Sequence, residues 1–148
     1  MKPVIFLRIA SLLTVIHAVL HTIGGVYGSV DPGPATVAVT AMKANQFLVM
    51  GHMRTYWDFY HGMGLAGTIS LTAEGIIMWQ LGSLVKTAGA RLRPMLVTFV
   101  LAYLAMSVNS NTYFFSAPVI VEIVIALCLG AAVVTANAPS VARERAMA

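Results

Sequence analysis

Charge is what this sequence has least of. Only 9% of its 148 residues are Asp, Glu, Lys or Arg, whereas 59% are hydrophobic and the mean hydropathy is +0.84. A soluble domain ordinarily has about a quarter of its residues charged. The composition therefore excludes an ordinary soluble domain and indicates a chain that lies in a membrane.

Cysteine and acidic residues are also scarce. The one cysteine, Cys128, has no partner for a disulfide within the chain, and we expect a structural thiol. Nine basic residues against five acidic ones give a net charge of +4. In so apolar a chain we interpret this excess as membrane topology and as affinity for anionic lipid headgroups, and we expect no nucleic-acid partner.

Long apolar stretches are what the sequence does contain. Crossing the hydrocarbon of a bilayer takes about 20 apolar residues in a helix. Four stretches meet this requirement: residues 4–26, 59–81, 95–112 and 117–137. Because they and their connections take up nearly the whole chain, the sequence predicts an all-α, polytopic four-transmembrane-helix bundle, with residues 1–148 forming a single membrane domain.

The basic residues predict an orientation, because cytoplasmic loops of membrane proteins collect Lys and Arg. If the N-terminus is inside, only Lys43 and Arg54 lie outside, and the other basic residues all lie in the cytoplasm. We therefore expect both termini to be cytoplasmic. The expected location is the cytoplasmic (inner) membrane of a bacterium.

The outer loop between the first two helices is about thirty residues long, which predicts structure within it. The breaker-rich "GGVYGSVDPGP" ends the first helix, and "ATVAVTAMKANQFLVMGHM" is expected to form a short helix at the outer membrane surface. In "RTYWDFY", Trp57 and its neighbouring tyrosines suit the membrane interface, and Asp58 is placed to cap the next helix.

Small and polar side chains recur at helical spacing in three of the predicted helices. In membranes such stripes face other helices, because lipid tails are as apolar as Leu. The first helix carries Ala10, Thr14, His17, His21, Gly24 and Gly28, and the third carries Thr98, Ala102, Ala105, Asn109 and Thr112. The second helix carries two such stripes, one with His61, Gly64, Thr68, Thr72, Gly75 and Trp79, the other with Met63, Gly67, Ser70 and Glu74.

The depths of the polar residues predict a pocket. Counted at 1.5 Å of rise per residue, five of them reach the outer half of the bundle: His17, His21, His61, Asn109 and Glu122. Trp57 and Asp58 would lie at its rim. We expect this pocket to bind a small apolar molecule or a membrane partner, and small-residue faces elsewhere favour a homo-oligomer. Glu74 lies deeper, with Ser11, Thr14 or an inner basic residue as expected partners.

Three other interpretations of the polar residues stay open. Glu122 with His21 or His61 could perform acid–base catalysis on a lipid-like substrate, such as isomerisation or epoxide or ring chemistry. His17 and His21 have the spacing of two metal ligands, and His21 with His61 could hold haem b. Packing alone also explains intramembrane histidines. The residues therefore leave the cofactor unassigned.

The runs "RTYWDFYHGMGLAGTISL", "WQLGSL" and "FFSAPVIVE" resemble a group of small bacterial four-helix integral membrane proteins with no assigned activity. A looser likeness to DoxX-like proteins lies in "RIASLLTVIHAVLHTIGG" and in the helix count. The chain is similar only in architecture to the sterol-isomerase and sigma-2 receptor fold. These resemblances imply the fold and carry no site residue over to this chain.

Overall fold

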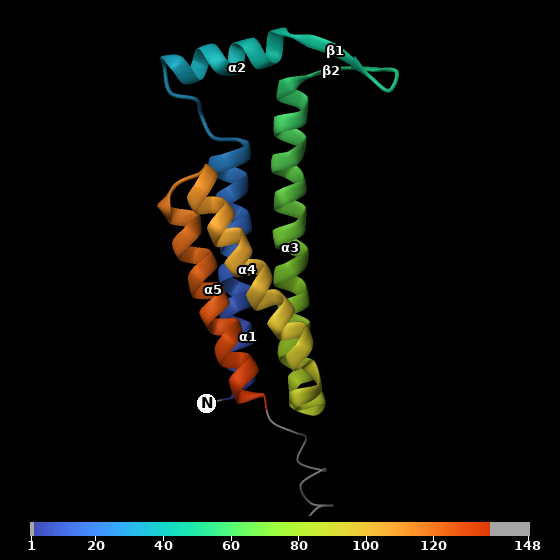
Figure 1. Cartoon of the computed structure of the whole chain (residues 1–148), viewed down its shortest axis with the longest axis vertical. Helices are drawn as coiled ribbons and strands as arrows, with labels where there is room; N and C mark the ends of the chain where they lie inside the picture. Colours follow the sequence, from blue (N-terminus) through green and yellow to red (C-terminus); the bar gives the residue numbers. More distant parts are fainter. Residues whose placement is uncertain (1, 137–148) are drawn as a thin grey trace, which may run out of the picture. The chain divides into compact units, whose positions relative to one another are not determined.

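The computed structural model describes residues 2–136, most of which are helical (Figure 1). The elements in chain order are α1 (Pro3–Leu20), the π-helical turn η1 (His21–Val26), α2 (Pro34–Ala44), β1 (Gln46–Val49), β2 (His52–Thr55), α3 (Tyr56–Ala88), the 3₁₀ turn η2 (Gly89–Leu92), α4 (Arg93–Tyr113) and α5 (Ser116–Thr135). The all-α prediction is confirmed, with one small β-hairpin added.

Three continuous helical runs within residues 2–136 are long and apolar enough to cross a membrane: Pro3–Val26, Tyr56–Tyr113 and Ser116–Thr135. The prediction of several long apolar helices is thereby confirmed. The middle run contains α3, η2 and α4, so the predicted second and third helices lie within it. Prolines lie near the starts of α1, α2 and α4. The N–H groups of a first helical turn make no hydrogen bond within the helix, so a proline there removes none.

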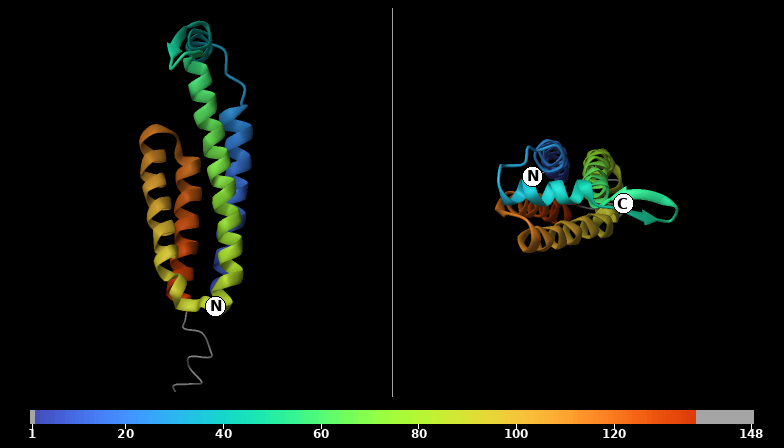
Figure 2. Two further views of the ribbon diagram at one scale, coloured as in Figure 1. Left: turned by 90° about the vertical axis from the view of Figure 1, so that its right-hand side faces the viewer. Right: turned by 90° about the horizontal axis from the view of Figure 1, so that it is seen from above.

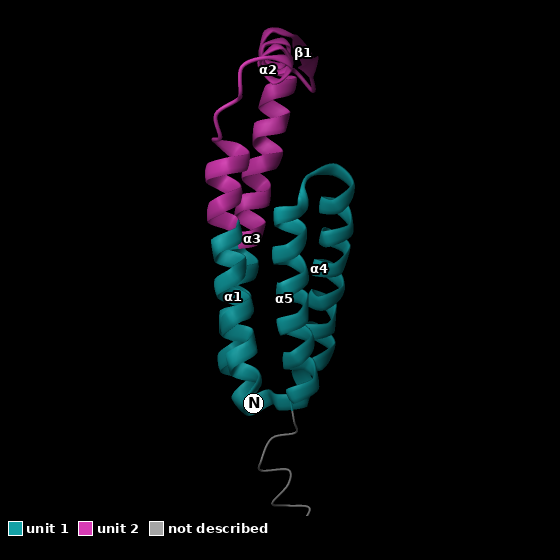
Figure 3. Cartoon of the chain, turned by 90° about the vertical axis from the view of Figure 1, so that its left-hand side faces the viewer, with its two compact units in different colours: residues 1–17, 72–148 teal, residues 18–71 magenta. Residues whose placement is uncertain are grey.

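The chain divides into two compact units, and a single domain over the whole chain stays a prediction (Figure 3). Unit 1 consists of residues 1–17 and 72–148. In it α4 and α5 lie side by side and antiparallel, as their short connection predicts (Figures 1 and 2). The larger fully buried side chains of unit 1 are Leu7, Met78, Leu96, Tyr103, Ile125 and Leu129.

Helix α4 corrects one prediction. The stripe of small and polar residues that includes Asn109 was expected to face other helices, but it is exposed. The helix instead buries Leu96, Tyr103, Ser107 and Ser110. The reason is that the hydroxyls of Tyr103 and Ser110 pair with groups on other helices, and these bonds determine which face of α4 turns inward.

Unit 2 consists of residues 18–71 and contains η1, α2, the hairpin and the first half of α3. A short helix was expected in the segment after the first apolar helix; α2 lies there, but it ends at Ala44. The following residues form the antiparallel pair β1–β2, which the sequence analysis did not predict. Met50 and Gly51 make its two-residue turn with φ of 47° and 84°, the combination that matches strand twist.

Candidate functional site

The first turn of α3 is fixed by a reciprocal pair of hydrogen bonds. The Thr55 N–H donates to Oδ2 of Asp58 at 2.7 Å, and the Asp58 N–H donates to Oγ1 of Thr55 at 3.1 Å. This arrangement satisfies two N–H groups that the helix itself cannot, as in a capping box. Asp58, predicted as a capping residue, thus acts together with Thr55 and stays exposed.

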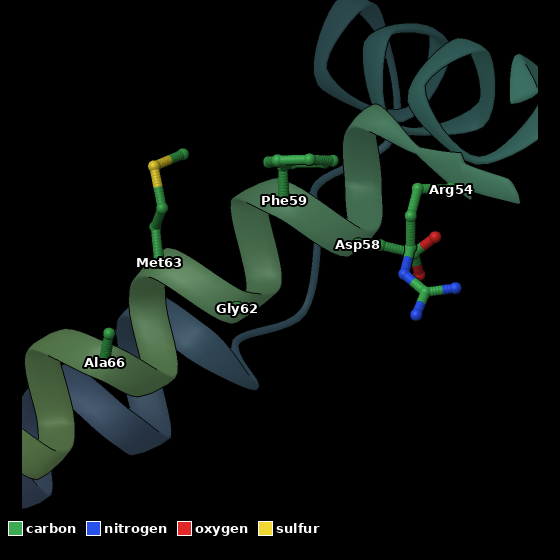
Figure 4. A pocket seen from close by; sticks show the side chains of 6 residues that line it. All are labelled: Arg54, Asp58, Phe59, Gly62, Met63 and Ala66. Atoms are coloured by element: carbon green, nitrogen blue, oxygen red, sulfur yellow. The ribbon is translucent and has the colours of Figure 1, made fainter. Parts of the chain in front are cut away.

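Beside this turn the surface is hollowed. The α3 hollow has a volume of about 350 Å³ and is lined by Arg54, Asp58, Phe59, Gly62, Met63 and Ala66 (Figure 4). Its two charged residues lie at the β2 end, and its apolar residues follow along α3 at the spacing of one helix face. The hollow therefore changes from charged to apolar along the helix axis.

Aromatic rings support the hollow from the hairpin. The ring of Phe47 in β1 is tilted against that of Tyr56 and stacked on that of Phe59, with ring centroids 4.6 and 5.8 Å apart. Its neighbour Leu48 points away and is 68% exposed. Because successive strand residues alternate between faces, the hairpin places one ring against α3. This packing orients Phe59 at the wall of the hollow.

Trp57, predicted at the rim of the pocket, does not line the hollow. Its ring stacks with those of Tyr60 and His61, at centroid distances of 5.5 and 6.0 Å, and Lys43 of α2 lies 4.5 Å above it. His61 also meets Tyr27 edge-on at 5.2 Å. The imidazole of His61 is therefore part of an aromatic cluster.

His21 has different surroundings in the same unit. Its Nε2 is 3.0 Å from the carbonyl oxygen of Gly64, and a Cβ at position 67 would approach that nitrogen to 3.2 Å. One residue later, Thr22 bonds to Thr68 at 2.9 Å. Two polar contacts thus join the π-helical turn at His21–Val26 to α3. Turns of this type often occur at functional sites.

Glu122 lies in unit 1, with 2% of its surface exposed. Ser110 of α4 donates to its Oε1 at 2.9 Å, and within residues 2–136 its Oε2 has no hydrogen-bond partner. Asn109, expected in the pocket, is exposed, and the adjacent serine supplies the contact instead. His17 is half-buried in unit 1. His21 and His61 belong to unit 2, so the gathering of all five residues stays a prediction.

Glu74 is held by a residue that the sequence analysis did not single out. The phenol of Tyr103 donates to its Oε2 at 2.8 Å and lies 3.0 Å from Oγ1 of Thr14. Thr14, one of the expected partners, thus reaches Glu74 through Tyr103. The available signal was a tyrosine in the middle of an apolar helix, since a buried phenol needs a polar partner.

The described residues 2–136 contain no group of three His, Cys, Asp or Glu side chains that could hold a metal ion. The Oε1 of Glu122 accepts its hydrogen bond from a serine hydroxyl. The α3 hollow lies within one unit and can contact a charged group and an apolar chain together.

The chain matches no protein-family model, no curated protein and no solved structure with which it was compared. The resemblance to DoxX-like proteins consequently stays a prediction.

Proposed function

We propose that this chain is a four-span integral membrane protein that binds a lipid-like amphiphile in the α3 hollow. The single observation that carries the binding proposal is the change in the hollow from Arg54 and Asp58 to Phe59, Met63 and Ala66. An amphiphile changes in the same order, from a polar headgroup to an apolar chain. A volume of about 350 Å³ lies within the range of small-molecule sites.

The number of spans follows from length. The middle helical run has 58 residues, about 87 Å at the α-helical rise, whereas the hydrocarbon core is about 30 Å thick. Gly89, with φ of 51°, interrupts it between α3 and α4. Two spans in this run, together with α1 and α5, make four. The basic residues favour cytoplasmic termini in a bacterial inner membrane.

The position of the hollow suits a ligand that enters from the membrane. Tyr56, Trp57 and Tyr60 are typical of the interface between headgroups and hydrocarbon. Arg54 would then lie at headgroup level, and Ala66 about 15 Å deeper than Tyr56 along the helix. Met63 is 67% exposed, and its flexible side chain adapts to irregular apolar ligands.

Acid–base catalysis on a lipid-like substrate is the second candidate. The observation that favours it is the buried Glu122 carboxyl, whose Oε2 is unpartnered within residues 2–136. A carboxyl group in an apolar membrane segment costs free energy, and such groups therefore commonly mark functional positions. Turnover of a lipid that is lost in a Glu122→Gln protein would favour this function over binding alone.

The binding proposal is tested by filling the hollow. A Cβ at Gly62 meets no atom within 4 Å, so Gly62→Leu fits the backbone while its side chain occupies the hollow. Gly130→Leu, also in open space but on α5, is the matched control. Lipids extracted from the purified proteins would be identified by mass spectrometry.

We expect one lipid class enriched above the bulk membrane composition in the wild type and in Gly130→Leu, and lost in Gly62→Leu. Arg54→Gln should weaken its retention about fivefold, because one basic residue near a membrane surface contributes about 1 kcal/mol. The same lipid content in all four proteins would contradict the proposal.

A further inference from the structure

A cationic side chain in unit 1 lies fixed on the surface of α3. The guanidinium of Arg8 lies 3.5 Å above the ring of Trp79, and its Nη2 donates to Oγ of Ser83 at 2.9 Å. Gly82 leaves room for it, because a Cβ there would lie 3.3 Å from Arg8 Nε. The side chain is therefore held in one place by three consecutive contacts along α3.

The charge of Arg8 has no counter-charge in the described part of the chain. No carboxyl group within residues 2–136 pairs with it, and its Nη1 is buried without a hydrogen-bond partner. The Ser83 hydroxyl accepts from Arg8, so its own proton is available to another acceptor. A buried guanidinium N–H without a hydrogen-bond partner is costly. These groups together favour an anion supplied from outside the chain.

An apolar groove begins at the same tryptophan. It has a volume of about 290 Å³ and is lined by Ser11, Leu12, Val15, Gly75, Ile76 and Trp79. The Ser11 hydroxyl donates to the Gly75 carbonyl at 2.7 Å, so it offers no free donor to the groove. A hydrocarbon chain suits such a lining, whereas free phosphate would leave the groove unused.

We propose that Arg8, Ser83 and Trp79 bind the headgroup of an anionic phospholipid, with an acyl chain in the adjacent groove between α1 and α3. The phosphate accepts hydrogen bonds from the guanidinium and from the Ser83 hydroxyl. Lys86, in the last turn of α3, is a basic residue outside this set of contacts and provides a matched control.

Snorkelling is the simpler explanation of an arginine near the end of a membrane helix. A guanidinium that only reaches for headgroup water would expose its nitrogens, whereas Nη1 of Arg8 is buried. Snorkelling also predicts no preference among lipids of different headgroup structure beyond general surface charge. A preference at Trp79 that depends on Arg8 and Ser83 but not on Lys86 therefore separates the two explanations.

The test uses the full chain with Trp57→Phe, which leaves Trp79 as the only tryptophan. The protein is placed in bilayers of phosphatidylcholine that contain acyl-brominated phosphatidylglycerol or acyl-brominated phosphatidylcholine at equal mole fraction. Bromine quenches tryptophan on contact, so the two quenching curves report the relative affinity of the two lipids next to Trp79.

We expect about a fivefold preference for phosphatidylglycerol, equal quenching by both lipids in Arg8→Gln, and an unchanged preference in Lys86→Gln. Ser83→Ala should lower the preference while keeping the arginine, which covers the case in which Arg8→Gln fails to fold. Equal quenching by both lipids in the wild type, or the same loss in Lys86→Gln, would overturn the proposal.

Two further controls assign the source of the anion. Inorganic phosphate in solution should leave the preference unchanged, and competition by it would overturn the lipid assignment. Glu144 lies outside the described residues, and Glu144→Gln should leave the preference unchanged; an altered preference would identify that carboxyl group as the partner and overturn the site. Gly62→Leu should also leave it unchanged, since the α3 hollow is a separate site.

Discussion

Tyr103 of α4 donates a hydrogen bond to Glu74 of α3, with 2.8 Å between the two oxygens. The phenol is fully buried and also lies 3.0 Å from the hydroxyl of Thr14 on α1. Three helices of unit 1 therefore meet at one hydroxyl group. In an apolar interior such a contact fixes the rotation of each helix about its own axis, because turning any of the three helices would leave polar atoms without partners.

Tyr103→Phe should lower the free energy of unfolding by about 1–3 kcal/mol, because the half-buried Glu74 carboxyl loses its donor. Tyr113→Phe, on the same helix and 74% exposed, is the control and should have almost no effect. Denaturant unfolding in detergent micelles would measure both. Equal stability of the two variants would show that the Tyr103 hydroxyl contributes nothing.

Ser110 and Glu122 should behave as a coupled pair. Ser110→Ala removes the one donor to the Glu122 carboxyl and should cost about 1–3 kcal/mol. In a Glu122→Leu background the same change should cost clearly less, which a double-mutant cycle measures. Asn109→Ala, one residue away and exposed, should be neutral. A larger cost at Asn109 would restore the pocket predicted from the sequence.

Two glycines should respond oppositely to alanine. A Cβ at Gly75 would come within 2.7 Å of Val15 Cγ2, so Gly75→Ala should destabilise unit 1 by forcing α1 and α3 apart. A Cβ at Gly130 meets nothing within 4 Å, and Gly130→Ala should stabilise α5 by up to about 1 kcal/mol. Thermal unfolding compares them, and a gain at Gly75 would refute the close approach.

Membrane orientation can be measured by cysteine labelling in a Cys128→Ala background. With cytoplasmic termini, Lys43→Cys should react with a membrane-impermeant maleimide on intact cells. Lys86→Cys should react only after the membrane is opened. The reverse pattern would invert the topology, and labelling of both positions from outside would contradict a membrane span between them.

Helix positions could be predicted because apolar length is a property of sequence alone. The first three predicted stretches fall within α1 with η1, α3 and α4. The fourth, 117–137, extends past the end of α5 at Thr135, and its residue 137 lies outside the described part. The hairpin could not be predicted, because "QFLVMGHMRT" has no Asn-Gly or Asp-Gly turn. Its turn depends on Met50 adopting a positive φ, which the packing of Phe47 on α3 supports.

Site residues were harder to predict because helix rotation depends on tertiary contacts. Asn109 and Ser110 are both polar, and the spacing of small residues favoured the first, yet the second contacts Glu122. Of the residues that line the α3 hollow, the sequence analysis placed Asp58 at the rim of the predicted pocket, whereas it identified Arg54 only as a basic residue on the outer side. Apolar residues such as Phe59 and Met63 carry no sequence signal that separates a ligand contact from a lipid-facing position.

The binding proposal is tested most directly by photo-crosslinking in native membranes. A photoreactive analogue of the lipid class that co-purifies with the protein would be activated, and the modified peptides identified by mass spectrometry. The hollow predicts crosslinks concentrated on residues 54–66 and abolished by Gly62→Leu. Crosslinks spread evenly over the exposed faces of α1, α4 and α5, and unchanged in that variant, would contradict a site in the α3 hollow.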